Sequence, residues 1–249
     1  MGAVQKIVIV IPFFNESERL DFAQMQALFS DSPAVEVYCM NDGSMDNTGQ
    51  RLTEWAAGHP RQVKLFHLPR NVGKAEAVRQ GMLAALASGA ALTGYIDADM
   101  AAPASEIRRL IHILEAGPDD LCAVIGARVR LLGWKIERNP WRHYVGRCFA
   151  TAASLVLRLP IYDTQCGAKF FRHTPALESA LGHPFHSRWI FDVELIDRLA
   201  KASRNLRIDP CVQFLEVPLQ AWSAKPGSKL TAISFIQAGW DLLWILRKK

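Results

Sequence analysis

Cysteine is scarce in this chain, and its spacing excludes two common devices for stabilising a fold. The 249 residues contain five cysteines, and no two of them form a C-x-x-C pair. A disulfide framework uses an even set of cysteines in a short secreted chain, and a structural zinc site uses closely spaced pairs. We therefore expect free thiols and a reducing compartment.

Long apolar runs and a strong charge of one sign are also missing. The apolar run near the N-terminus covers only eight residues, 7–14, and no small-residue cleavage site follows it. We expect a buried first strand there, no signal peptide or transmembrane helix, and a cytoplasmic protein. Half of the residues are hydrophobic, 21% are charged and the net charge is +5, which excludes a disordered chain and permits anionic partners.

Motifs that mark several common enzyme classes are absent. The sequence has no G-x-G-x-x-G after its first predicted strand, no G-x-S-x-G and no H-E-x-x-H. Residues 71–74 (NVGK) resemble half of a phosphate-binding loop, but Leu68 and Ala75 stand where a Walker A motif needs glycine and serine or threonine. The seven histidines are scattered, so surface or packing roles suit them better than metal ligation.

The chain does contain a regular alternation of apolar runs and helical patterns. Strands are predicted over 6–11, 35–40, 63–67, 91–96 and 121–126, and helices over 21–29, 48–57, 74–88 and 104–116. Continuous Val/Ile runs separated by helices indicate an α/β fold, with a mostly parallel sheet covered by helices on both faces. In the less regular second half, helices are predicted over 147–159, 190–202 and 230–246, and one or two strands over 206–217.

Polar residues follow each of the first four predicted strands. They occupy 12–16, 41–48, 70–74 and 97–99. In a parallel sheet the carboxyl ends of the strands lie along one edge, and ligands bind outside that edge. The sequence therefore predicts a ligand site built from these four loops.

Asp97 and Asp99 are the sharpest of these features. At an extended strand end, side chains two residues apart point to the same side, so the two carboxylates repel each other unless a cation lies between them. Hard oxygen ligands suit Mg²⁺ or Mn²⁺, which keep positions open for phosphate oxygens. For a D-x-D motif considered alone, an acidic surface turn is the alternative.

The loops after the second and third strands allow two interpretations each. Asp42 can accept a hydrogen bond from a base or ribose, or residues 42–48 can form only a turn and a helix cap, with Gly43 permitting the turn. Lys74 opens a predicted helix, where a positive charge opposes the helix dipole. Such a local conflict points to a function, and a bound diphosphate would resolve it.

Together these residues resemble glycosyltransferase family 2, whose members have the GT-A fold. The match covers 12–16, 41–48, 71–74 and 97–99, in that order. The chain is further similar to the dolichyl-phosphate β-glucosyltransferases and other polyprenyl-phosphate glycosyltransferases of that family. The segments that carry this similarity are 74–82 (KAEAVRQGM), 163–171 (DTQCGAKFF), 188–195 (RWIFDVEL) and Trp222 with 227–230 (GSKL). Phe14 stands where the family often has Tyr, which removes one phenolic hydrogen bond.

The resemblance implies an inverting, metal-dependent transfer of a hexose, with glucose from UDP-glucose as the expected donor. It implies donor binding by Pro12, Phe14, Glu16, Asp42, Ser44, Lys74, Asp97, Ala98 and Asp99. Asp97 and Asp99 are expected to contact the ribose and Mg²⁺ or Mn²⁺, with Asp99 favoured as the direct metal ligand, and the cation would offset charge on the departing UDP. The expected catalytic residues are Asp99, Lys74 and Arg128. Ala101 favours the glucosyl branch over the mannosyl branch.

The net charge is concentrated in one segment. Residues 126–147 carry six basic side chains and one acidic side chain, and the rest of the chain is balanced. We interpret the segment as a clamp on the phosphate of a polyprenyl-phosphate acceptor; a solvated basic loop is the alternative. The expected clamp residues are Arg128, Arg138, Arg142 and Lys229. A phosphate monoester is already a nucleophile, whereas a hydroxyl acceptor would need a base, for which Asp163 and Asp192 are candidates.

The expected organisation is one GT-A unit, in which residues 1–127 bind the nucleotide sugar and 128–249 bind the acceptor. The apolar C-terminal helix ends in Arg247, Lys248 and Lys249, so it can lie peripherally in a membrane interface or pack in the core. The alternative functions are a family 2 enzyme with another donor sugar or a hydroxyl acceptor, and a non-catalytic nucleotide-sugar binder. A nucleic-acid partner is not expected, because the basic residues lack an aromatic platform.

Overall fold

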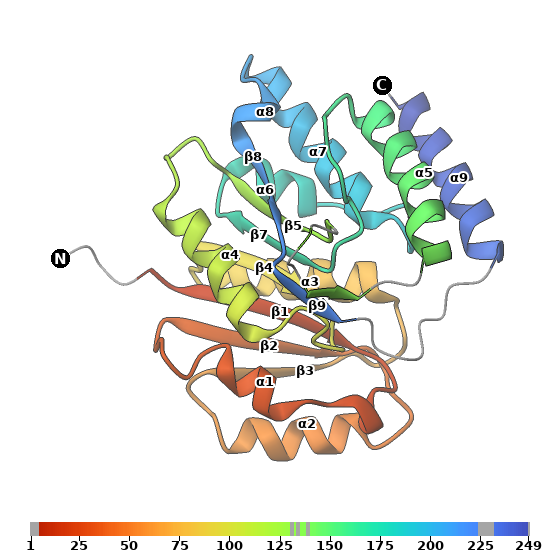
Figure 1. The fold of residues 1–249 in the computed structure, drawn as a ribbon. Helices are drawn as coiled ribbons and strands as arrows, with labels where there is room; N and C mark the ends of the chain where they lie inside the picture. Colours follow the sequence, from red (N-terminus) through yellow and green to blue (C-terminus); the bar gives the residue numbers. More distant parts are fainter. Residues whose placement is uncertain (1–4, 130–131, 133–134, 138–139, 224–231, 249) are drawn as a thin grey trace.

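A seven-stranded sheet with strand order β3-β2-β1-β4-β7-β5-β8 forms the centre of the molecule (Figure 1). The computed structural model describes residues 5–129, 132, 135–137, 140–223 and 232–248. The strands of this sheet are β1 (Ile7–Phe13), β2 (Val35–Asn41), β3 (Val63–His67), β4 (Leu92–Ile96), β5 (Ala123–Ala127), β7 (Ala168–Arg172) and β8 (Phe214–Pro218). All neighbours pair in parallel except β7, which runs antiparallel to β4 and β5, so the predicted mostly parallel α/β sheet is confirmed.

Helices cover both faces of the sheet, as the continuous apolar strands predict. On β1, Ile9 and Ile11 pack into one core cluster, and Val8 and Val10 pack into another, because successive side chains of a strand point to opposite faces. The first face is covered by α1 (Phe22–Ala27), α2 (Thr48–Ala57) and α4 (Ala104–Ala116), and the second by α3 (Lys74–Ala87), α6 (Pro175–Leu181) and α7 (Phe191–Asn205). A short 3-10 helix, η1 (Ser17–Arg19), follows β1.

A third layer lies outside α7. It consists of α5 (Pro140–Leu157) and α9 (Ala232–Arg247), which run side by side in Figure 1 and pack on α7 through an apolar cluster that includes Leu157, Ile196 and Leu242. A separate two-stranded sheet joins β6 (Lys135–Glu137) to β9 (Ala221–Ser223). Within the described residues, no helix combines the length and the apolar character that crossing a bilayer requires.

The prediction of strand structure over 206–217 is wrong for its first half. Arg207 has a positive φ of 58° where the chain turns out of α7, and a one-turn helix, α8 (Pro210–Gln213), follows. The Asp209 carboxylate caps this turn by accepting a hydrogen bond from the Cys211 backbone N–H, and Pro210 suits the first helical position. Only β8 is extended, because there the chain pairs with the edge of β5.

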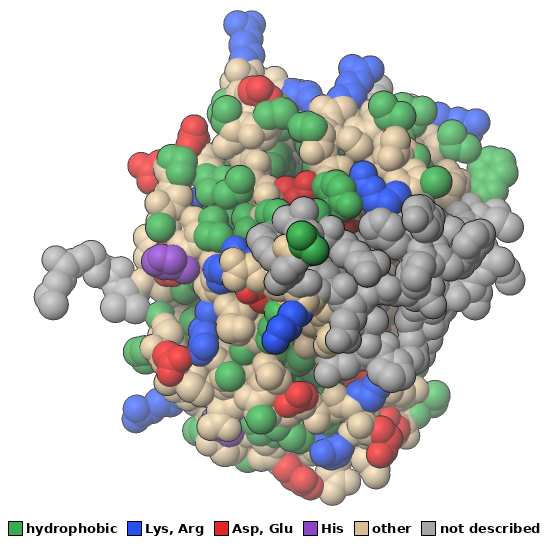
Figure 2. All heavy atoms as spheres, viewed as in Figure 1, with side chains coloured by type: hydrophobic (Ala, Val, Ile, Leu, Met, Phe, Trp, Pro, Cys, Tyr) green, Lys and Arg blue, Asp and Glu red, His purple; other side chains and the backbone are tan. Residues whose placement is uncertain are grey.

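The visible surface over α1, α2 and β3 mixes acidic and basic side chains. Figure 2 shows them interspersed over the lower part of the molecule, where Figure 1 places these elements. This part of the surface therefore fits a chain whose basic excess lies mainly in one segment of the sequence.

Candidate functional site

Backbone and side-chain hydrogen bonds join the loops that follow β1 and β2. The two strands pair in register up to Phe13 and Asn41, so both loops start at the same level. The backbone N–H of Asn15 donates to Ser44 Oγ (3.1 Å), and that of Glu16 donates to Thr48 Oγ1 (2.8 Å). Two of the four predicted loops therefore form one structure.

Asp42 connects this structure to the loop before α3. Its side chain is buried, and its two carboxylate oxygens accept hydrogen bonds from the backbone N–H groups of Val72 (2.7 Å) and Gly73 (2.9 Å). The neighbouring Gly43 has a φ of +63°, and a Cβ there would lie 2.5 Å from the backbone nitrogen of Asn71. The expected hydrogen bond from a base or ribose to Asp42 thus competes with a structural role, since the carboxylate holds the 70–74 loop in place.

Lys74 is the first residue of α3, and its ammonium group points at the fourth loop. Nζ lies 2.5 Å from Oδ1 of Asp97, and both side chains are 40% exposed. Burial lowers the pKa of Lys74, but the negative charges of Asp97 and Asp192 outweigh that effect and raise it. The unfavourable position of a cation at a helix start is thus offset by a carboxylate, even without a bound diphosphate.

The D-x-D motif lies in a turn, which corrects the prediction of an extended strand end. β4 ends at Ile96, the Met100 backbone N–H donates to the Asp97 carbonyl (3.2 Å), and Met100 has a φ of +49°. The carboxylates of Asp97 and Asp99 nevertheless act on each other. Burial, followed by the charge of Asp97, raises the pKa of Asp99.

Two carboxylates on one turn fit the chemistry of Mg²⁺ or Mn²⁺ with a diphosphate. The described residues contain no group of three or more His, Cys, Asp or Glu side chains that could hold a metal alone. These cations bind through one or two carboxylates and complete their coordination with water and substrate phosphates. Burial is the larger cause of the raised pKa of Asp99, and the charge of Asp97 adds to it, so a cation between the two carboxylates would relieve the second contribution. The donor set therefore fits a cation that arrives with phosphate oxygens.

Gly167 sets the position of Asp97 from the other side. The Asp97 backbone N–H donates to the Gly167 carbonyl (3.0 Å), and a Cβ at position 167 would lie 1.9 Å from Oδ2 of Asp97. The glycine belongs to the 163–171 segment, which the sequence analysis identified by resemblance without assigning it a role. Its position inside a motif, directly before a buried strand, is the signal that could have found it.

A buried ion pair lies behind the turn. Lys169 is fully buried, and its Nζ lies 2.5 Å from both Asp192 Oδ1 and the Cys166 carbonyl oxygen. The Tyr95 hydroxyl donates to the same Asp192 oxygen. The sequence analysis missed Lys169 and Tyr95, because a lysine inside the AKFFR strand gives no pattern that separates a buried cation from an exposed one.

Arg128 lies beside the turn and is bound to Asp163. Its Nε and Nη2 are 2.7 and 2.8 Å from the two oxygens of that carboxylate, and its guanidinium lies 5.5 Å from the centre of the Trp222 ring. Burial lowers the pKa of Arg128, but the charge of Asp163 and its hydrogen bonds raise that pKa by a larger amount, so the net shift is upward. Glu216 holds the Asp163 segment by accepting hydrogen bonds from the backbone N–H groups of Tyr162 (2.7 Å) and Asp163 (2.6 Å).

The remaining predicted residues divide into two groups. Phe14 and Ala98 lie half-buried in the loops that meet at this edge, and Glu16 forms an ion pair with Arg19 (2.6 Å). Pro12, which was expected in the first loop, is a half-buried residue near the end of β1. Arg138 and Lys229 lie outside the described residues, as does the side chain of Arg142, whose backbone belongs to α5. The proposed acceptor clamp is therefore described only at Arg128.

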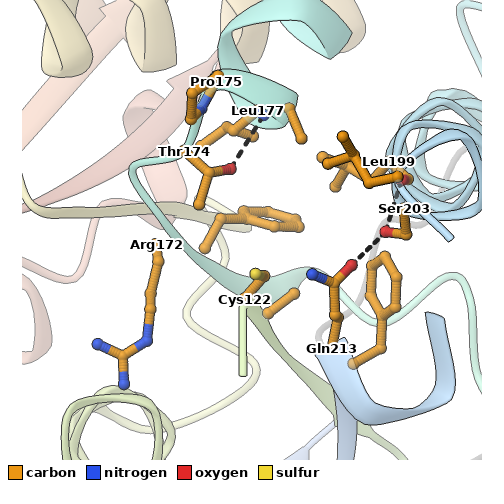
Figure 3. A pocket seen from close by; sticks show the side chains of 13 residues that line it. Cys122, Arg172, Thr174, Pro175, Leu177, Leu199, Ser203 and Gln213 are labelled. Atoms are coloured by element: carbon orange, nitrogen blue, oxygen red, sulfur yellow. Dashed lines mark hydrogen bonds between the residues drawn. The ribbon is translucent and has the colours of Figure 1, made fainter. Parts of the chain in front are cut away.

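A cavity of about 210 Å³ lies away from this site, at the start of β5 (Figure 3). Its lining is mainly apolar and includes Phe171, Leu177 and Phe214, and Figure 3 shows Arg172 directed away from it. That guanidinium donates to backbone carbonyls, among them that of Leu121 (2.7 Å). The lining of the cavity includes no carboxylate, and its arginine is bound to backbone carbonyls, so the 97–99 turn remains the candidate site.

Comparisons with known proteins identify the family and the fold. The model of the family described as "Glycosyl transferase family 2" matches residues 8–178. A dolichyl-phosphate beta-glucosyltransferase of Trichomonas vaginalis is 31% identical over 247 residues, covering 95% of this chain and 69% of that protein. The enzyme of the same name from Drosophila melanogaster is 31% identical over 255 residues (96% and 74%), and a polyprenol monophosphomannose synthase of Mycolicibacterium smegmatis is 26% identical over 239 residues (96% and 88%).

Solved structures show the fold. A glucosyl-3-phosphoglycerate synthase from Mycobacterium tuberculosis, in complex with Mn²⁺, UDP-glucose and phosphoglyceric acid, superposes with a TM-score of 0.64 at 18% identity, covering 98% of this chain and 80% of that one. The same enzyme with Mn²⁺, UDP and glucosyl-3-phosphoglycerate gives a TM-score of 0.62 at 18% identity with the same coverage. The sheet and its covering helices thus have the GT-A arrangement. With the family model matching well over half of its length, the chain is a glycosyltransferase and belongs to glycosyl transferase family 2.

Proposed function

We propose that this enzyme transfers glucose from UDP-glucose to a polyprenyl phosphate such as dolichyl phosphate, with inversion at the anomeric carbon and with a divalent cation. The proposal is supported by several relatives named dolichyl-phosphate beta-glucosyltransferase, which are 28–31% identical to this chain over nearly its whole length. The residues around the 97–99 turn would supply the chemistry that it requires.

On the donor side, Asp97, Asp99 and Lys74 are the residues that would meet the diphosphate. The two carboxylates would hold Mg²⁺ or Mn²⁺, which when bound offsets the charge that builds on the departing UDP. The ammonium group of Lys74 can donate to the diphosphate oxygens from the start of α3. The loops that contain Pro12, Phe14, Glu16, Asp42, Ser44 and Ala98 would enclose the nucleoside.

On the acceptor side, one observation carries the proposal: both candidate bases are engaged in ion pairs. Asp163 binds Arg128 through both oxygens, and Asp192 is buried against Lys169 and Tyr95. A hydroxyl acceptor needs a base to take its proton, whereas a phosphate oxygen attacks the anomeric carbon directly as the bond to UDP breaks. Such a single displacement inverts the configuration, and it suits a site whose carboxylates already serve other partners.

The acceptor phosphate would be held by Arg138, Arg142 and Lys229, with Arg128 adding its charge beside them, because Asp163 already binds Nε and Nη2 of Arg128. Arginine suits this role because its planar guanidinium can contact two phosphate oxygens at once. Residues 128–249 would then form the acceptor half and residues 1–127 the donor half of one enzyme.

A release assay tests this function. UDP or GDP release is measured with a panel of nucleotide sugars, with and without a polyprenyl phosphate, and with and without Mg²⁺ or Mn²⁺. We expect UDP-glucose to be the best donor and the lipid phosphate to stimulate release. Asp99→Asn should abolish the stimulation, while the matched exposed variant Asp119→Asn should retain it. No stimulation by the lipid phosphate would defeat the proposal in favour of a hydroxyl acceptor.

We also propose that the outer face of α5 and α9 contacts the membrane that holds the acceptor. Along α9, Ala238, Leu242 and Ile245 are buried, whereas Trp240, Leu243 and Leu246 are exposed. Leu155 of the neighbouring α5 is exposed as well, and α9 ends in the exposed residues Arg247 and Lys248. An apolar face with a tryptophan and a basic end is typical of a helix that lies in a membrane interface.

Vesicle binding tests this contact. The double variant Trp240→Ser/Leu243→Ser should bind vesicles of phosphatidylcholine and phosphatidylglycerol about tenfold less than the unmodified enzyme, because two apolar side chains lose their burial in the interface. The control Leu206→Ser/Leu215→Ser removes two exposed apolar side chains from another surface and should bind normally. Equal recovery of both variants with the vesicles would contradict the contact.

A further inference from the structure

Lys74 occupies one of the two carboxylates that a divalent cation would use. Its Nζ lies 2.5 Å from Oδ1 of Asp97, while the Asp99 carboxylate accepts a hydrogen bond from the Ala101 backbone N–H (3.0 Å). Both members of the Lys74–Asp97 pair are 40% exposed, so an incoming ligand can reach them. A cation cannot take the same oxygen of Asp97 until the ammonium group has left it.

We propose that Lys74 is an internal counter-ion that blocks the divalent cation from Asp97 until a nucleoside diphosphate draws the ammonium group away. The inference rests on the proposed function, since it takes the 97–99 turn as the place where donor and cation meet. It adds an order of binding to that function: the free enzyme binds the cation weakly, and the donor makes the cation site accessible.

The side chains of the pair differ in how easily they can move. The backbone of Asp97 is held by its hydrogen bond to the Gly167 carbonyl, and its short side chain lies against Gly167. Lys74 carries its charge on a flexible four-carbon stem, and beyond Asp97 its ammonium group has the Phe191 ring within 5.7 Å. When the pair opens, the lysine therefore moves and the aspartate stays in place for the cation.

Because Lys74 exchanges Asp97 for the diphosphate, binding of the cation and binding of the nucleotide are thermodynamically coupled. A cation that binds alone must break the Lys74–Asp97 pair and leave the ammonium group without its hydrogen-bonded anion, with only the more distant charges of Asp192 and Asp99 acting on it. A diphosphate that binds together with the cation gives the ammonium group new oxygens. Because coupling between sites is reciprocal, the nucleotide should tighten cation binding by the factor by which the cation tightens nucleotide binding.

Mn²⁺ binding without turnover tests the proposal. Electron paramagnetic resonance of free Mn²⁺ gives its Kd for the unmodified enzyme and for Lys74→Met, each with and without UDP. Without UDP, we expect Lys74→Met to bind Mn²⁺ about fivefold more tightly, the upper range for loss of a half-exposed ion pair. UDP should then tighten Mn²⁺ binding less in Lys74→Met than in the unmodified enzyme. Lys74→Gln provides a second neutral variant, with thermal melting to confirm that each is folded.

Arg188→Met is the matched control, because it removes one positive charge near the same loop. The Arg188 guanidinium lies 3.5 Å from Asn71 Oδ1 and next to Gly73, and it makes these contacts on the loop instead of on the 97–99 turn. We expect its Kd for Mn²⁺ to change less than twofold. An equal gain in Arg188→Met would show a general effect of charge and would overturn the proposal, as would the absence of any gain in both folded Lys74 variants.

The outcomes separate this inference from the proposed function. If the unmodified enzyme binds no Mn²⁺ even with UDP, the metal-dependent transfer itself is wrong. If it binds Mn²⁺ with UDP, but neither Lys74 variant binds Mn²⁺ more tightly without UDP, only the counter-ion role of Lys74 is wrong.

Discussion

At the scale of single residues, the position of Asp97 depends on Gly167, which lies directly before β7 and contacts the Asp97 carboxylate. A Cβ at position 167 would lie 1.9 Å from the Asp97 carboxylate, so Gly167→Ala must displace that side chain. A shift of about 1 Å at a reacting group can cost about a hundredfold in rate. We expect kcat to fall by one to two orders of magnitude, with a higher Mn²⁺ requirement. Gly58→Ala, where a Cβ meets its nearest atom at 3.4 Å, should leave kinetics unchanged; equal rates for the two variants would contradict the role of Gly167.

Asp46 makes stability depend on pH at the acid end. Burial raises its pKa, but hydrogen bonds from Thr48 and Ser17 together outweigh this and lower the pKa from 3.8 to about 2. A lowered pKa means that the stabilisation is present above the unfolded value and is lost as pH falls toward the folded value. The enzyme should therefore melt at a higher temperature than Asp46→Asn near pH 5, and the difference should shrink between pH 4 and pH 2. A difference that stays constant over this range would exclude the ionised carboxylate as its cause.

At the scale of elements, β7 is stabilised in the sheet by a buried ion pair. Lys169 on this strand is 0% exposed and pairs with Asp192 at the start of α7. Removing one partner of a buried pair leaves the other charge without compensation, so Lys169→Met should lower the free energy of unfolding by about 3–5 kcal/mol. Lys64→Met is the control, because Lys64 is half-exposed and Glu36 keeps its second partner, Lys6; we expect a loss of at most about 1 kcal/mol. Denaturant unfolding measures both, and equal losses would contradict the argument.

The same strand marks the limit of prediction from the sequence. β1, β2, β3, β4 and β5 follow from Val/Ile runs between amphipathic helices, and their polar ends could be assigned to one edge because parallel strands share an orientation. β7 joins β4 and β5 in the antiparallel sense from far along the chain, and no local pattern specifies such a pairing.

The turn at 97–99 could not be predicted from the sequence either, because D-A-D fits an extended strand end and a turn equally well. Asp42 could be identified as important, but only the fold shows that its carboxylate holds the Val72 and Gly73 backbone.

At the scale of the whole molecule, the net charge of +5 corresponds to the excess in residues 126–147. Two of its basic side chains already have structural partners: Arg128 binds Asp163, and Arg147 donates to the Tyr162 carbonyl and stacks on the Tyr162 ring. The part of the segment left for an acceptor phosphate therefore includes Arg138 and Arg142. An attraction between exposed charges is screened by salt, whereas the buried Arg128–Asp163 pair is screened much less.

Salt should therefore weaken acceptor binding through Arg138 and Arg142. Raising NaCl from 0.1 to 1 M shortens the screening length from about 10 to about 3 Å, so the KM for a polyprenyl phosphate in neutral detergent micelles should rise severalfold. Arg138→Gln/Arg142→Gln should have the higher KM already at low salt and little further dependence on salt. The control Arg61→Gln/Arg207→Gln removes the same charge from exposed sites elsewhere and should behave like the unmodified enzyme. If both pairs change the salt dependence equally, the acceptor responds to net charge alone, and the proposed clamp is wrong.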